Sequence, residues 1–242
     1  MMGQSQKPIE EILKSLNGKK SVVIVGCGGC STVFHTGGVE EVDEMAEILT
    51  GKGKDVKKVA LPFAVFACYQ PFSSMFIKQH KKDFKECDSI LMMSCGDGLQ
   101  TVRQILDEEL NIIKPMYPAI NAMGVSGGGP SIFMEKCQAC GECVMGKTAG
   151  ICPLTECPKG LLNGPCGGTR PDGKCEVNSD KDCAWYLIYN RLKKIGEVDK
   201  INTFNEPQDW SKALRPRVFE IEPLDLHKHL GRTKKVIESL GI

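Results

Sequence analysis

The chain has few aromatic residues, almost no net charge and no long apolar run. Phe, Trp and Tyr make up 6% of its 242 residues, which is little for a surface that stacks on nucleic-acid bases. A net charge of +1 gives no electrostatic attraction to nucleic acid or to an anionic membrane. No window reaches about 18 consecutive apolar residues, the length of a membrane-spanning helix. We therefore expect no nucleic-acid partner and no membrane insertion.

A secretory signal is also missing from the start of the sequence. Residues 1–20, MMGQSQKPIEEILKSLNGKK, are polar and lack the apolar stretch of such a signal. We therefore expect a cytoplasmic protein in a reducing compartment. Disulfides are rare there, and dense cysteine favours metal sites.

Cysteine is the residue that this chain has in excess, with eight of its thirteen between positions 137 and 183. This stretch begins with the spacing C-x2-C-x2-C, as does the bacterial ferredoxin pattern that binds [4Fe–4S] clusters and ends in Cys-Pro. Cys-Pro occurs twice here. Two four-cysteine sites would use all eight: Cys137, Cys140, Cys143, Cys152, Cys157, Cys166, Cys175 and Cys183. The spacing predicts an electron-transfer protein with at least two clusters.

Zinc is the alternative occupant of these cysteines. All-cysteine zinc sites favour paired C-x2-C units, whereas the cysteines after the first three are 5 to 9 residues apart. A zinc-binding scaffold without redox activity is therefore the second hypothesis. The spacing leaves the pairing open, because in two-cluster ferredoxins the last cysteine of a run serves the other cluster, and Cys152 or Cys157 could do the same.

The first half of the chain alternates between strand and helix patterns. Residues 21–26, Ser-Val-Val-Ile-Val-Gly, are typical of a buried parallel strand. The other expected strands are 56–61, 89–93 and 116–122, and the expected helices are 39–51, 71–82 and one from Asp97 to about 110. This alternation predicts an α/β fold, an open doubly wound parallel sheet of the flavodoxin or Rossmann type.

Four cysteines follow the predicted strands of this half. Cys27 and Cys30 come directly after the first strand, Cys68 follows the apolar stretch 61–67 that begins at the end of the second, and Cys95 follows the third. Since the carboxyl ends of parallel strands share one edge where ligands bind, these four predict a third cluster site. Buried packing is the alternative, above all for Cys68. Cys87, in a charged turn, is expected to take no part.

The loop after the first strand also invites a dinucleotide interpretation. Gly26-Cys27-Gly28-Gly29-Cys30 lacks the third glycine of G-x-G-x-x-G, because Ser31 stands there. An independent flavodoxin-like enzyme using this edge is therefore not favoured.

The composition suggests three regions. Residues 1–126 are expected to form the α/β domain, and 130–201 an irregular, ferredoxin-like iron–sulfur domain rich in glycine and proline. Such a stretch builds little hydrophobic core, so metal ligation must cross-link it. Residues 202–242, with Trp210 and a last helix over 223–240, are expected to form a docking tail for a partner or a cover for their own domain.

The cysteine-rich run resembles a known family. It contains E-x-C-x2-C-G-x-C, T-A-G-I-C-P-x-T-x-C-P-K-x-L-L-N-G-P-C-G-G, G-K-C-E-V and D-C-A-W-x-L-I-Y. These motifs resemble the cysteine-rich small subunit of acetogen-type methylenetetrahydrofolate reductase, whose domain also occurs fused behind the reductase barrel. V-G-C-G-x-C, T-G-G-V-E-E-V and S-C-G-D-G-x-Q-T-V extend the resemblance to roughly residues 20–200.

The resemblance implies a complex. The partner would be an FMN-containing TIM barrel that reduces methylenetetrahydrofolate in the acetyl-CoA pathway, and this chain would carry electrons between that flavin and an upstream donor protein. The eight cysteines of the run, with Cys27, Cys30 and Cys95, fall on the family's cysteine positions. Many relatives have a further cysteine near position 34, where this chain has Phe34, so the resemblance makes Cys68 more important. No catalytic residue is expected.

Overall fold

The computed structural model describes residues 1–129 and 131–221, so the last helix expected over 223–240 lies outside the described residues. The chain divides into two compact units. The larger unit contains Met1–Ala139 and Cys143–Asn205, and the smaller contains Cys140–Glu142 and the segment from Glu206 onward.

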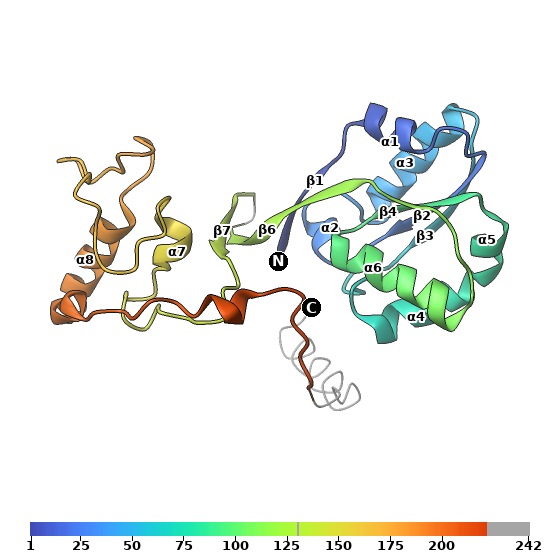
Figure 1. The fold of residues 1–242 in the computed structure, drawn as a ribbon. Helices are drawn as coiled ribbons and strands as arrows, with labels where there is room; N and C mark the ends of the chain where they lie inside the picture. Colours follow the sequence, from blue (N-terminus) through green and yellow to red (C-terminus); the bar gives the residue numbers. More distant parts are fainter. Residues whose placement is uncertain (130, 222–242) are drawn as a thin grey trace, which may run out of the picture. The chain divides into compact units, whose positions relative to one another are not determined.

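A four-stranded parallel sheet forms the centre of the α/β region (Figure 1). Its order is β3-β2-β4-β5, from β2 (Ser21–Gly26), β3 (Asp55–Ala60), β4 (Ser89–Met93) and β5 (Met116–Pro118). The predictions for β2 and β4 are confirmed residue for residue, and β3 begins one residue earlier than expected. Strands β2 and β4 are almost entirely buried, as expected for a sheet covered on both faces.

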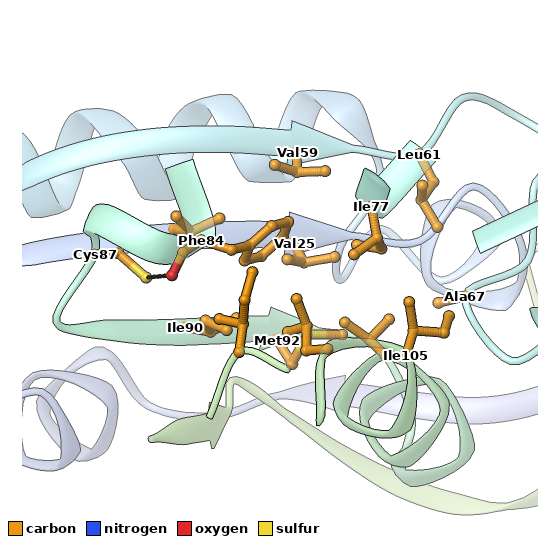
Figure 2. Packing of buried hydrophobic residues seen from close by; sticks show 14 of the residues in the cluster. Val25, Val59, Leu61, Ala67, Ile77, Phe84, Cys87, Ile90, Met92 and Ile105 are labelled. Carbon is orange, nitrogen blue, oxygen red and sulfur yellow. Dashed lines mark hydrogen bonds between the residues drawn. The ribbon is translucent and has the colours of Figure 1, made fainter. Parts of the chain in front are cut away.

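The two faces of this sheet carry separate hydrophobic cores. Val22 and Ile24 of β2 face α1 (Ile9–Ser15) and α3 (Val39–Gly51). Val23 and Val25 contribute to the opposite core, with α4 (Gln70–Gln79), α5 (Lys81–Glu86) and α6 (Gly96–Gln104). Figure 2 shows that second core, where side chains of the sheet meet Ile77, Phe84 and Ile105. Alternate residues of one strand therefore serve opposite cores, as the pleat requires.

The helix expected over 39–51 is confirmed as α3, whereas the other predicted helices of this region differ in detail. The helix expected over 71–82 is two helices, α4 and α5, which meet at His80. The helix expected from Asp97 is α6, which is capped by Cys95 instead and continues as a π-helical turn, Ile105–Glu109. A short helix, α2 (Cys30–Val33), begins at the second cysteine of the Cys-Gly-Gly-Cys loop.

A second, antiparallel sheet was not predicted. It has the order β1-β6-β7, from β1 (Met2–Gln6), β6 (Ile120–Gly128) and β7 (Phe133–Cys137). The strand expected over 116–122 is therefore wrong as a single element, because β5 joins the parallel sheet and β6 the antiparallel one. The boundary expected between residues 126 and 130 falls within this sheet, because Gly127 and Gly128 belong to β6 and pair with Met134 and Phe133. A Cβ at Gly128 would overlap the carbonyl oxygen of Ile132, so this close hairpin needs glycine.

The cysteine-rich segment has little regular structure. Its helices are α7 (Pro153–Glu156) and α8 (Ala184–Lys194), followed by a 3-10 turn, Val198–Asn202. Trp185, Ile188 and Leu192 of α8 form a small core with Ala149 and Ile151, and the indole of Trp185 donates a hydrogen bond to the Leu161 carbonyl over 2.9 Å. The smaller unit contains one 3-10 turn in its described part, Trp210–Ala213. Among the described helices, none has the length and apolarity needed to cross a membrane.

Candidate functional site

Three cysteines follow adjacent strands at the carboxyl edge of the parallel sheet. Cys27 directly follows β2, Cys68 lies in the loop after β3, and Cys95 follows β4. Gly26 of β2 pairs with Ala60 of β3 and with Met93 of β4, so the three strands end level with one another. We call Cys27, Cys68 and Cys95 the edge cysteines.

Glycine holds two of these loops together. The Gly28 amide donates a hydrogen bond to the Val65 carbonyl over 3.1 Å, and the Gly28 carbonyl accepts one from the Ala64 amide over 2.8 Å. A Cβ at Gly28 would overlap the Pro62 carbonyl, and one at Gly29 would overlap the ring of Phe66. The glycines of the Cys-Gly-Gly-Cys loop thus serve loop packing, which brings the chain after β3 against Cys27.

The variant Gly28→Ala tests whether glycine is needed for the packing of these two loops. We expect the variant to lose about 1–3 kcal/mol of unfolding free energy, because the added methyl meets backbone that has no room to move. Gly51→Ala is the matched control, since a Cβ at Gly51 has no atom within 4 Å. Urea unfolding of both variants measures the effect, and equal midpoints would refute the packing argument.

The edge cysteines interact with one another. The Ala67 amide donates to the Cys27 sulfur over 3.4 Å. Burial, followed by repulsion from the Cys95 and Cys27 thiolates, raises the pKa of Cys68 to about 11 although part of the residue is exposed. Burial also raises the pKa of Cys95. The Cys68 and Cys95 thiols therefore need a positive partner before both can act as thiolates, and a bound metal group supplies such a charge.

Cys30 and Cys87 are placed differently from the edge cysteines. The sulfur of Cys30 accepts a hydrogen bond from the Met2 amide of β1 over 3.3 Å. Cys87 is buried in the core of Figure 2, where its thiol donates to the Phe84 carbonyl over 3.4 Å. The charged neighbours of Cys87 in the sequence therefore do not indicate exposure, and its thiol has a structural role.

Four other cysteines line a single pocket in the cysteine-rich segment. They are Cys157, Cys166, Cys175 and Cys183, and we call them the pocket cysteines. Cys175 and Cys183 are buried, Cys157 is half-buried and Cys166 is exposed. Pro158, Pro165 and Trp185 complete much of the wall. The pocket thus supplies the four thiol donors that one [4Fe–4S] cluster requires.

Local hydrogen bonds fix the two buried pocket cysteines. The Cys175 amide donates to the Lys181 carbonyl over 2.9 Å, and the Cys183 amide donates to the Gly173 carbonyl over 2.9 Å. Cys183 is the N-cap of α8, and its sulfur lies 3.1 Å from the Thr169 hydroxyl. Burial would raise the pKa of Cys183, but the Thr169 hydroxyl and the backbone amides at the start of α8 outweigh it and lower that pKa. The helix N-terminus therefore favours a thiolate here.

Cys166 lies beside a pair of opposite charges. Its thiol is 3.3 Å from the Glu176 carboxylate, which also forms an ion pair with Lys159. A Cβ at Gly168 would overlap that carboxylate, so a side chain at this position would displace Glu176 from over the loop. The spacing of the cysteines predicted neither this pair nor the role of Thr169, because both depend on how the loops fold back.

The remaining four predicted ligands occupy separate positions. Cys137 ends β7, and its sulfur accepts from the Ala139 amide over 3.3 Å. Cys152 is the N-cap of α7. The Gln138 side chain donates to the Leu154 carbonyl over 2.7 Å, which ties the end of β7 to α7. Cys143 is exposed.

Cys140 belongs to the smaller unit, which has its own set of contacts. The Glu142 carboxylate accepts from the Asp209 amide over 3.0 Å and from the Lys212 ammonium over 2.8 Å. The Gln208 side chain donates to the Glu142 carbonyl over 3.2 Å. The hydrogen bond from Lys212, more than any other contact, lowers the pKa of Glu142. Part of the predicted tail thus binds the loop that carries Cys140.

Across residues 1–129 and 131–221, no three or more His, Cys, Asp or Glu side chains come together in a way that would hold a single metal ion. No curated protein and no solved structure gives a significant match to the chain. Residues 117–211, which include β6, β7 and all eight cysteines of the cysteine-rich run, match the family described as methylene-tetrahydrofolate reductase C terminal, and this match links the chain to that enzyme system.

Proposed function

We propose that the chain is an electron-transfer subunit that carries [4Fe–4S] clusters and exchanges electrons with the FMN of a partner methylenetetrahydrofolate reductase subunit. The observation that carries the proposal is the single pocket lined by Cys157, Cys166, Cys175 and Cys183. Four thiols from a segment with little hydrophobic core are the donor set of an iron–sulfur centre, and such a segment gains its stability from the metal.

The pocket also supports a specific pairing of ligands. If the pocket cysteines hold one cluster, the other cluster of this region falls to Cys137, Cys140, Cys143 and Cys152. That set has the spacing C-x2-C-x2-C followed by Cys-Pro, the ferredoxin-like part of the sequence. The edge cysteines would contribute to a third cluster in the α/β region.

When bound, each cluster accepts and releases one electron at a time. The chain's own residues prepare the pocket for this role. The N-terminus of α8 and the Thr169 hydroxyl favour the Cys183 thiolate, and Trp185 covers part of the wall with apolar surface that excludes water. The ammonium of Lys159 lies close to Cys166, where its charge offsets the negative charge that reduction adds.

Two observations support the proposed partner, the family match and the exposed side chains of the second unit. The family match of residues 117–211 supports a link between the cysteine-rich segment and the methylenetetrahydrofolate reductase system, and the chemistry of folate reduction would belong to the flavin-containing TIM-barrel subunit. The tail exposes Trp210, Leu214 and Phe219, which are 56%, 69% and 73% accessible. Aromatic and apolar groups of this kind are frequent anchors of protein interfaces. An upstream donor protein in the cytoplasm would supply the electrons.

The test is the metal content of protein purified without oxygen. We expect about twelve irons per chain with an equal amount of acid-labile sulfide, the content of three clusters. About eight would limit the clusters to the cysteine-rich segment. Stoichiometric zinc with little iron would overturn the proposal and support the scaffold hypothesis. Co-purification of a yellow flavoprotein tests the proposed partner separately.

A further inference from the structure

The smaller unit joins two stretches of chain that are far apart in the sequence, and one of them contains a predicted ligand. It consists of Cys140–Glu142 and the segment from Glu206 onward. Cys140 is the middle cysteine of the C-x2-C-x2-C spacing. The tail contacts the two residues that follow this cysteine, Gly141 and Glu142.

The Glu142 side chain is bound by the tail at both of its oxygens. Oε1 accepts a hydrogen bond from the Lys212 ammonium over 2.8 Å, and Oε2 accepts one from the Asp209 amide over 3.0 Å. The Asp209 carboxylate caps the 3-10 turn Trp210–Ala213 by accepting from the Ser211 amide over 3.0 Å. The cap satisfies a free amide at the start of the turn, and it thereby holds the turn that presents Lys212 to Glu142.

The backbone of the Cys140 loop is held as well. The Glu142 carbonyl accepts two hydrogen bonds, one from the Gln208 side chain over 3.2 Å and one from the Cys140 thiol over 3.5 Å. A thiolate bound to metal has no proton to donate, so of these two bonds the one from Gln208 remains after ligation. Gln208 is 9% exposed, and this burial strengthens its hydrogen bond by excluding water.

Gly141 allows the tail to approach this loop closely. Its φ is +89°, in the left-handed region that favours glycine. A Cβ at Gly141 would lie 2.8 Å from the carbonyl oxygen of Lys212. The glycine and the glutamate that follow Cys140 therefore both contact the same turn of the tail.

We propose that three residues of the tail are positioning residues, which hold the Cys140 loop ready to bind iron. They are Gln208, Asp209 and Lys212. The inference rests on the proposed function, because it concerns the cluster assigned there to the C-x2-C-x2-C cysteines and Cys152. A ligand that is already in place rebinds its metal more readily than a mobile one. Removing the tail contacts is therefore expected to make this cluster lose its iron faster.

The experiment follows the EPR signals of the full anaerobic protein after an excess of iron chelator is added. Cys140→Ala first identifies the signal of the Cys140 cluster, which is the component that this variant lacks. In Gln208→Met and in Lys212→Met we expect this component to decay about two- to fivefold faster than in wild type, the effect of losing one hydrogen bond or exposed ion pair. The other components should decay at the wild-type rate.

Two further variants serve as controls. Lys200→Met is the matched control, because Lys200 pairs with Glu197 over 2.7 Å in another 3-10 turn and its side chain is 43% exposed, against 46% for Lys212. We expect it to behave like wild type. Lys212→Arg keeps a cationic donor and should restore most of the wild-type decay rate.

The reduction potential separates the effect of position from that of charge. Lys212→Met leaves the Glu142 carboxylate without the Lys212 ammonium, so the potential of the Cys140 component should become more negative. Gln208→Met changes no charge, and we expect it to speed the decay with little change in potential. A redox titration followed by EPR measures both variants.

Other results would overturn the inference in recognisable ways. Wild-type decay of the Cys140 component in both Gln208→Met and Lys212→Met would refute the positioning role and leave the proposed function intact. Equal acceleration of every component, in Lys200→Met as well, would also refute it. If Cys140→Ala keeps every component, Cys140 is not a ligand, and the inference fails together with the assigned pairing. Stoichiometric zinc with little iron in wild type would remove the proposed function itself.

Discussion

Cys175→Ala is expected to lose about four irons per chain and to unfold the segment around the pocket. Cys175 is buried and lines the pocket together with three other cysteines. The segment's own core is small, and folding that depends on metal is lost with the metal. Iron analysis gives the first result, and hydrogen exchange over residues 143–205 gives the second. Exchange within the parallel sheet should not change.

Cys87→Ala is the matched control for this variant. Both cysteines are buried, but Cys87 lies in the core of the α/β region with its thiol on the Phe84 carbonyl. We expect Cys87→Ala to keep all of its iron and to lose only the packing of one sulfur atom. Full iron content in Cys175→Ala as well would contradict the pocket as a cluster site.

Combining substitutions tests the pairing of ligands. Two residues that serve one cluster are not independent, so their effects do not add. The double variant Cys166→Ala, Cys175→Ala is therefore expected to lose about four irons, no more than the single variant. Cys143→Ala combined with Cys175→Ala should lose about eight. Equal losses in the two double variants would refute the pairing.

The strands of the parallel sheet could be predicted because they are buried on both faces. Burial of this kind produces continuous apolar runs such as Ser21–Gly26. Residues typical of turns flank such a run on both sides. The antiparallel sheet has no such pattern. β1 reads Met-Gly-Gln-Ser-Gln, and most residues of β6 and β7 are exposed or half-exposed. Its pairing depends on long-range partners, which local sequence does not encode.

The sequence singled out the cysteines that line the pocket as candidate ligands, but it did not predict that these four lie together. Cysteine spacing singled out eight candidate ligands. The spacing of Cys157, Cys166, Cys175 and Cys183 does not exclude other ways of dividing those eight between two sites. The grouping results from the fold of the loops, in which the Lys174 and Asp182 backbones pair and bring Cys175 and Cys183 together. The position of Cys30 depends on β1, a strand that was not predicted.

Cys68→Ser combined with Cys95→Ser is expected to remove about four irons and leave the other clusters intact. These two cysteines suit the test because neither is fully buried, whereas Cys27 belongs to the core beside Val25. A serine at Cys27 would bury a hydroxyl without a certain partner, at a cost of about 1–3 kcal/mol. The chosen pair therefore separates ligation from folding.

Two measurements decide the outcome for this double variant. The iron content should fall from about twelve to about eight atoms per chain. The EPR spectrum of the reduced protein should lose one component without change in the others. The thermal unfolding of the parallel sheet should stay close to that of Cys87→Ala, since both hydrophobic cores remain. Unchanged iron would mean that the edge cysteines only pack, and the α/β region would then support the electron-transfer segment without carrying a cluster of its own.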